Sequence, residues 1–248
     1  MPRSPLGARA PAAFPYVLAR HASPIDRAHG SIPDELQRGK EVNVRLAAAR
    51  LDGMVVQPGQ VFSHHHAIGR PSRARGFRRG LELRDGRPSA GIGGGLCQVS
   101  NAMYWVAAQA GMRIVERHRH GLDLFPDDRR TVPFGCGATI VYRTTDLRWR
   151  NPLSVAVAIR ASADDGRFAL ELRTEADPMI RVEVWEVDHR FVPDAGGWIR
   201  ENRLRRRITA LDGSVLVDEE LARNRGRVMY EPTPEQLACG GVSPKQPS

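Results

Sequence analysis

The sequence predicts an α+β fold. We expect a mixed helix and strand N-terminal part that carries a glycine-rich loop, a cysteine-bearing helix and a histidine-bearing strand, followed by antiparallel β-strands. Two observations support this prediction. The first part contains two segments whose apolar residues recur with the helical period. From about residue 138 onward, short alternating segments are separated by turn signals such as Asp165-Gly166, a segregation typical of α+β domains.

Composition limits the classes of protein and partner. The chain has 248 residues, enough for one large domain or two small ones, and its 41% hydrophobic residues exclude a wholly disordered protein. The formal net charge is +9 and the pI about 10.4, so we expect an anionic ligand or a peripheral contact with acidic membrane. A basic run can equally be a solvated surface. The arginine runs at 70–80 and 200–208 lack interleaved aromatics and a DNA-reading helix, so nucleic acid is not expected as a partner.

Cysteine usage and the N-terminal segment indicate a compartment. The three cysteines, Cys97, Cys136 and Cys239, are odd in number and widely spaced, which favours neither a disulfide framework nor a zinc ribbon. Prolines and arginines interrupt the first apolar patch, unlike the core of a secretion signal, and no later window reaches membrane-span length. We therefore expect a reducing, cytoplasmic location.

The elements of the first part follow in order. Residues 1–35 are rich in Pro, Ala and Arg, and we expect them to be poorly ordered until a helix begins. That helix is predicted over 33–53, because acidic residues favour its start and a glycine follows its last apolar residue. A turn at Pro58-Gly59 and a short strand at 61–62 come next.

A second helix lies at the centre of the prediction. Residues 70–95 are expected to form an arginine- and glycine-rich loop with one strand, and the helix spans 97–110 with Gly111 as its cap. Its apolar residues fall on one buried face: Val99, Ala102, Met103, Val106 and Ala110. A strand follows, on which two-residue alternation brings three polar side chains to one face: Glu116, His118 and His120.

The second part is predicted to be an antiparallel sheet. Its strands are expected within 138–143, 146–151, 153–162, 167–175 and 180–192. Asp212-Gly213 is typical of a tight β-hairpin turn and is expected to join two further strands, within 205–211 and 214–221.

Cys97 is the candidate nucleophile. The first amides of a helix carry the positive end of its dipole, so a thiol there is biased toward thiolate, and a free thiol has a pKa of about 8.5. Exposed amides beside the sulfur could bind an oxyanion, and the histidine strand supplies a base. The alternative is a buried packing cysteine. The loop fits neither the dinucleotide nor the phosphate-loop fingerprint.

The predicted site therefore consists of a catalytic and a substrate-binding group. The catalytic residues are Cys97, His118 and His120. The substrate-binding residues lie in the loop and the first helical turn: Gly93, Gly94, Gly95, Gln98, Ser100 and Asn101.

No cofactor and no metal are expected. The outer members of the triplet His64–His66 could share a face and, with another ligand, hold a metal, and Cys97 with two histidines could form a zinc site. Tandem histidines in loops more often face solvent. Cys136 is expected to be a buried small residue.

Five segments, in order and spacing, resemble the VanW family, which is named for an accessory protein of glycopeptide-resistance gene clusters. They are "QPGQVFSHHHAIG", "GIGGGLCQVSNAMYW", "AGMRIVERHRHG", "VPFGCGATIVY" and "DLRWRNP". The resemblance runs from about Val42 to residue 231. We expect a VanW-like domain over 36–232, β-rich from about 138, and a flexible tail over 233–248.

The resemblance implies a chemistry. Some members are associated with peptidoglycan transpeptidation through a thioester on the motif cysteine, a role that falls on Cys97 with His118 or His120 as base. Many members have "GRDAT" where this chain has "GCGAT", so Gly137 occupies the acidic position. Asp123 and Glu116 are the candidate replacements that would orient the histidine.

Two functional hypotheses remain. The first is a cysteine-dependent acyl or peptidyl transferase or hydrolase that acts on peptidoglycan stem peptides or their peptide-bearing precursors. The second is a non-catalytic accessory module that binds such precursors or another anionic ligand, with the glycine loop and nearby arginines as the cradle. Those arginines are Arg73, Arg75, Arg78 and Arg79.

Overall fold

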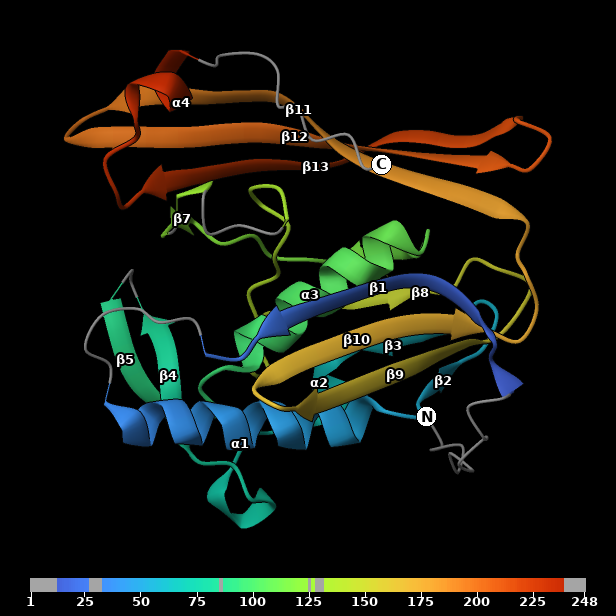
Figure 1. Cartoon of the computed structure of the whole chain (residues 1–248), viewed down its shortest axis with the longest axis horizontal. Coiled ribbons are helices and arrows are strands. Elements are labelled where there is room, and N and C mark those ends of the chain that lie inside the picture. Colours follow the sequence, from blue (N-terminus) through green and yellow to red (C-terminus); the bar gives the residue numbers. More distant parts are fainter. Residues whose placement is uncertain (1–12, 27–32, 85–86, 125, 128–131, 239–248) are drawn as a thin grey trace. The chain divides into compact units, whose positions relative to one another are not determined.

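The computed structural model describes residues 13–26, 33–84, 87–124, 126–127 and 132–238 (Figure 1). The chain divides into two compact units. The first unit comprises Met1–His118 and Ala138–Pro178, and the second comprises Arg119–Gly137 and Met179–Ser248. No helix among the described residues combines the length and the apolar character needed to cross a membrane.

The predicted α+β class is wrong, because the protein is mostly β. Strands account for 45% and helices for 22% of the structure, and the described residues form several sheets. Two of the four α-helices in the described part have five residues each, α2 (His64–Ile68) and α4 (Pro234–Ala238). The excess of strand arises where the sequence predicted loop or disorder, and in the long strands of the second unit.

The N-terminal segment provides one of these strands. Residues Tyr16–Pro24 form β1, within the segment expected to be poorly ordered, and pair antiparallel with β10 (Arg167–Thr174). The remaining parts of that segment at 1–12 and 27–32 lie outside the described residues, as does the tail from 239 onward.

The first unit contains three sheets. The largest has the order β1-β10-β9-β2, a smaller one has the order β3-β8-β6, and β4 and β5 form a hairpin. The predicted turn at Asp165-Gly166 joins β9 to β10. The remaining strands are β2 (Val55–Val56), β3 (Val61–Ser63), β4 (Arg79–Arg84), β5 (Arg87–Ile92), β6 (Arg113–Glu116), β8 (Arg148–Arg150) and β9 (Val157–Asp164).

Both long helices of the first unit are confirmed. α1 (Asp34–Leu51) packs against β9 and β4, and α3 (Leu96–Gln109) packs against β1 and β10. Gly111, at the predicted cap of α3, has φ 77°, a left-handed conformation that glycine adopts freely. The helices and sheets enclose one apolar core, whose fully buried members include Val44, Leu51, Met103, Val106 and Trp149.

The predicted strand at 138–143 does not form as a regular strand. This segment makes only isolated bridges, between His118 and Thr139 and between Val141 and Thr145. Its irregular course brings its backbone groups to α3 and to the end of β6, where they contribute to the candidate site.

The second unit is built on one sheet with the order β11-β12-β13-β7. β11 and β12 pair antiparallel, as do β12 and β13, and the predicted hairpin turn at Asp212-Gly213 joins the last pair. β7 adds in parallel to the end of β13. The strands are β7 (Leu122–Asp123), β11 (Ile180–Asp194), β12 (Gly197–Ala210) and β13 (Val215–Val228).

The arginines of β12 face acidic neighbours. Arg206 bonds to Glu219 at 2.9 Å, Arg207 to Asp218 at 2.8 Å, and Arg205 also bonds to Asp218. The positive charges of these side chains are thus paired with carboxylates of the same sheet. Four arginines of the 70–80 run are different, because they are exposed and no ion pair joins them to any described residue: Arg73, Arg75, Arg78 and Arg79.

Candidate functional site

Cys97 is the second residue of α3 and is exposed. Gly95 caps the helix with φ 100° and no side-chain bond. Within the first turn, the N–H of Leu96 donates to Gly93 and that of Gln98 to Gly95. The N–H of Cys97 has no acceptor among the described residues and is one of the unpaired amides of the first helical turn.

The glycines before Cys97 are required by close packing. A Cβ on Gly94 would lie 2.1 Å from the carbonyl oxygen of Gly80, and one on Gly95 would lie 2.5 Å from Cγ of Lys40. Gly93 and Gly95 also have φ values of 87° and 100°, which L side chains rarely adopt. Contact with β4 and α1 therefore accounts for this loop, and the predicted substrate-binding role of its glycines stays a prediction.

The polar residues of the first helical turn bond to the protein itself. Gln98 donates to Ser23 Oγ of β1 at 2.9 Å. Ser100 Oγ donates to the carbonyl of Ala138 at 2.7 Å, and Asn101 Oδ1 accepts from the Ala138 N–H at 2.8 Å. These bonds hold the segment that begins at Ala138 against α3. Binding of substrate by the three side chains stays a prediction.

The Cys97 thiol has a raised pKa. Desolvation by the surrounding protein is the main cause, although part of the residue reaches solvent; a bond from the backbone N–H of Ile140 acts against it, and the carboxylate of Glu82 raises the pKa further. The predicted lowering of the pKa by the helix dipole is therefore wrong for this structure. The thiol is protonated at neutral pH and needs a base to become a nucleophile.

His118 is held by Glu116, the residue at the end of β6. The ring Nε2 lies 3.1 Å from Glu116 Oε1, which confirms that these two side chains share a face. Desolvation raises the pKa of Glu116, but the N–H of Asp146, His118 and Arg148 together lower it below the usual value. Glu116 is thus a carboxylate that accepts the Nε2 proton, and Nδ1 of His118 is left as the basic nitrogen.

One short segment joins the cysteine to this histidine. The N–H of Thr139 donates to the backbone carbonyl of His118 at 2.8 Å, and the next N–H, that of Ile140, donates to the Cys97 sulfur. Consecutive residues of a single segment therefore contact His118 and Cys97. The irregular path of this segment could not be read from the sequence, which predicted a strand there.

Two further residues of the predicted site belong to the second unit. One is His120, which is exposed. Asp123, offered as an orienting group, is buried in that unit, where it accepts from Tyr230 Oη at 2.9 Å and pairs with Arg200. Of the two suggested carboxylates, Glu116 contacts His118. Cys136 is buried, as expected, and Cys239 lies outside the described residues.

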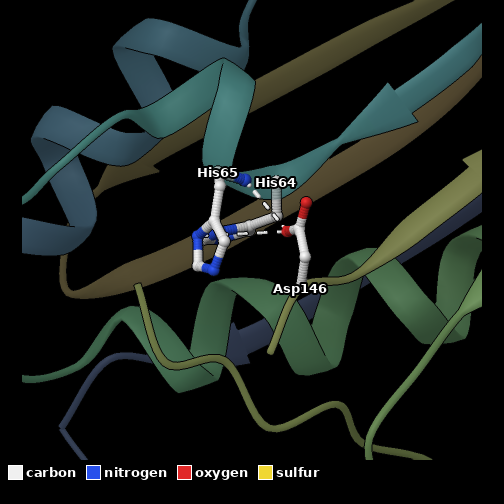
Figure 2. A group of neighbouring side chains, drawn as sticks. All are labelled: His64, His65 and Asp146. Carbon is white, nitrogen blue, oxygen red and sulfur yellow. Dashed lines mark hydrogen bonds and ion pairs between the residues drawn. The ribbon is translucent and has the colours of Figure 1, made fainter. Parts of the chain in front are cut away.

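A second polar cluster lies at the histidine triplet. One donor atom from each of His64, His65 and Asp146 lies within 4.8 Å of the others (Figure 2). The predicted pairing of the outer histidines is wrong, since His66 is exposed and the adjacent pair converges. Burial lowers the pKa of His64 to about 4; Asp146 acts in the opposite direction. Sequence reasoning did not propose Asp146 as a ligand, although this residue begins the segment "DLRWRNP".

Comparison with known proteins gives consistent results. The family model described as "VanW like protein" matches residues 39–173. The chain is 27% identical over 202 residues to "Vancomycin B-type resistance protein VanW" of Enterococcus faecalis, covering 81% of this chain and 73% of that protein. It is 30% identical over 138 residues to the uncharacterized protein YoaR of Bacillus subtilis, covering 54% and 43%. No solved structure matches significantly. The family match covers more than half of the chain, which therefore belongs to the VanW family.

Proposed function

We propose that this protein is a cysteine-dependent acyl or peptidyl transferase or hydrolase that acts on peptidoglycan stem peptides or their precursors. One observation carries the proposal: the sulfur of Cys97, a residue that reaches solvent, and the backbone carbonyl of the carboxylate-held His118 accept hydrogen bonds from consecutive residues of one segment. Nucleophile, base and orienting carboxylate are the three roles that thiol-dependent acyl transfer requires. The assignment is Cys97 as nucleophile, His118 as base and Glu116 as the group that orients His118.

The chemistry proceeds in two steps. Nδ1 of His118 accepts the proton of the Cys97 thiol while the sulfur attacks an amide carbonyl, and the N–H of Cys97 faces the developing oxyanion. The C–N bond then breaks, His118 returns the proton to the leaving amine, and a thioester remains on Cys97. Water or a second amine attacks the thioester, which gives hydrolysis or transpeptidation and restores the thiol.

The raised pKa of Cys97 fits this order of events. A thiolate already formed at rest would need no proton acceptor, whereas a protonated thiol must lose its proton during the attack. The stem-peptide substrate is supported by the family resemblance and by the name of the enterococcal relative, which refers to vancomycin resistance.

The direct test is capture of the thioester. We expect the protein incubated with a purified disaccharide–stem-peptide fragment to gain the acyl mass on Cys97, read by mass spectrometry after acid quenching. C97A removes the adduct, C136S keeps it, and H118Q slows its formation by about 100-fold or more. Because the thiol pKa lies above its ordinary value, the residual rate of H118Q should rise about tenfold per pH unit through pH 8.5.

Two outcomes would contradict the proposal. One is turnover that C97A retains. The other is precursor binding without any adduct, retained in C97A but lost when Arg73, Arg75, Arg78 and Arg79 are changed to Gln, which would favour a non-catalytic binding module on the exposed basic run.

A further inference from the structure

We infer that His64, His65 and Asp146 form a binding site for a divalent transition-metal ion of the zinc class. The three residues come from the start of α2 and from the turn that precedes β8. Figure 2 shows the carboxylate of Asp146 facing the two imidazole rings. The inference does not depend on the chemistry at Cys97.

His64 provides the strongest argument. The residue is only 1% exposed, and neither ring nitrogen has a hydrogen-bond partner among the described residues. Burial of an imidazole without a partner costs free energy, and an ion that took a ring nitrogen as its ligand would recover it.

The Nδ1 atom of His65 has a lone pair available for the same ion. Its Nε2 lies 2.8 Å from the carbonyl oxygen of Thr145 and 3.1 Å from that of Val141. Carbonyl oxygens only accept, so Nε2 carries the ring proton and Nδ1 bears the lone pair. Nδ1 lies 3.9 Å from Asp146 Oδ1. This is the usual arrangement of a metal-binding histidine, whose second nitrogen donates to a carbonyl or carboxylate.

Asp146 is fixed in place and still has an open position. Oδ1 accepts from the N–H groups of His65 at 3.0 Å and Leu147 at 2.8 Å, and Oδ2 accepts from Ser63 Oγ at 2.6 Å. A carboxylate offers about four acceptor positions, so one remains on Oδ2, while Oδ1 is the oxygen nearest His65 Nδ1. A proton on His65 Nδ1 would pair that ring with Asp146 and leave His64 without a partner, whereas a metal ion can take one donor atom from each of the three residues.

The donor set selects the kind of ion. Two imidazoles and one carboxylate suit Zn²⁺, Co²⁺ or Fe²⁺, whereas Mg²⁺ and Ca²⁺ prefer oxygen ligands. Ligands at zinc distances lie about 3.3 Å apart in a tetrahedron, so the donors, now within 4.8 Å, would close slightly around the ion. The side chains of His65 and Asp146 are 18% and 12% exposed, which leaves a route for the ion and a water ligand.

The test is titration of the metal-free full chain with Co²⁺. We expect about one equivalent to bind and produce visible d–d absorption, without a thiolate charge-transfer band, and we expect Zn²⁺ but not Mg²⁺ to displace it. H65A and H64L should each lose at least 100-fold in affinity. S63A removes a bond to the carboxylate and should lose about 10-fold.

Matched controls make the result decisive. H66A changes the exposed neighbour in the same helix and should bind Co²⁺ like the wild type, as should C97S. Circular dichroism checks that H65A and S63A, which alter partly exposed side chains, remain folded. The inference is overturned if the metal-free protein gives no Co²⁺ spectrum, if H65A and H64L bind normally, or if a thiolate band appears and C97S abolishes it.

Discussion

Two buried polar side chains, Arg200 in the second unit and His64 in the first, differ in how completely the protein satisfies them. Arg200 bonds to His189 at 2.8 Å and pairs with Asp123 at 3.3 Å and Asp127 at 2.7 Å. His64 is equally buried and has no hydrogen-bond partner among the described residues. A fully satisfied buried group stabilises the fold, whereas an unsatisfied ring that lies beside two other donor groups can bind a ligand.

The largest expected change in stability follows from removing Arg200, the buried group whose bonds are all satisfied. R200A should destabilise the protein by about 3–5 kcal/mol, because it leaves Asp123 buried with an uncompensated charge. Urea unfolding measures the loss. The matched control is R190A, whose exposed pair with Glu201 should contribute less than about 1 kcal/mol. If R200A lost as little free energy of unfolding as R190A, the stabilising role of Arg200 would be contradicted.

An uncharged member of the same unit should give an intermediate effect. Asn202 is 2% exposed; it donates to the Phe134 carbonyl at 2.8 Å and to Glu186 Oε1 at 2.5 Å, and it accepts from Asn224 Nδ2 at 2.8 Å. N202L removes these three bonds while it keeps the volume, and we expect the free energy of unfolding in urea to fall by about 1–3 kcal/mol. If N202L were as stable as the wild type, the hydrogen bonds of a buried side chain would not indicate how much it stabilises the protein.

The elements that local sequence predicts are those with strong local signals. α1 and α3 have apolar periodicity, and glycine turns mark the hairpins at Asp165-Gly166 and Asp212-Gly213. β1 could not be predicted, because Tyr16–Pro24 is mostly exposed or half-buried and acquires strand structure from its pairing with β10. Such long-range pairings turned the expected α+β fold into a mostly β one.

The candidate sites likewise contain one contact that local sequence predicts and one that depends on long-range strand pairing. Glu116 and His118 are two residues apart, so strand alternation places them together, and this contact could be predicted. Asp146 is 81 residues from His65, and only the pairing of β3 with β8 brings them together. The thiol pKa was predicted in the wrong direction, because the helix dipole can be read from sequence and the desolvation cannot.

The most direct test of the account is the stability of H64L, with and without zinc. Leucine keeps the volume of His64 and removes the two unsatisfied nitrogens, so unfolding of the metal-free protein should change by less than about 1 kcal/mol. Zinc at 100 times its dissociation constant should stabilise the wild type by about 2.7 kcal/mol and leave H64L unchanged. A loss of several kcal/mol in metal-free H64L, or equal stabilisation of both proteins by zinc, would contradict the account.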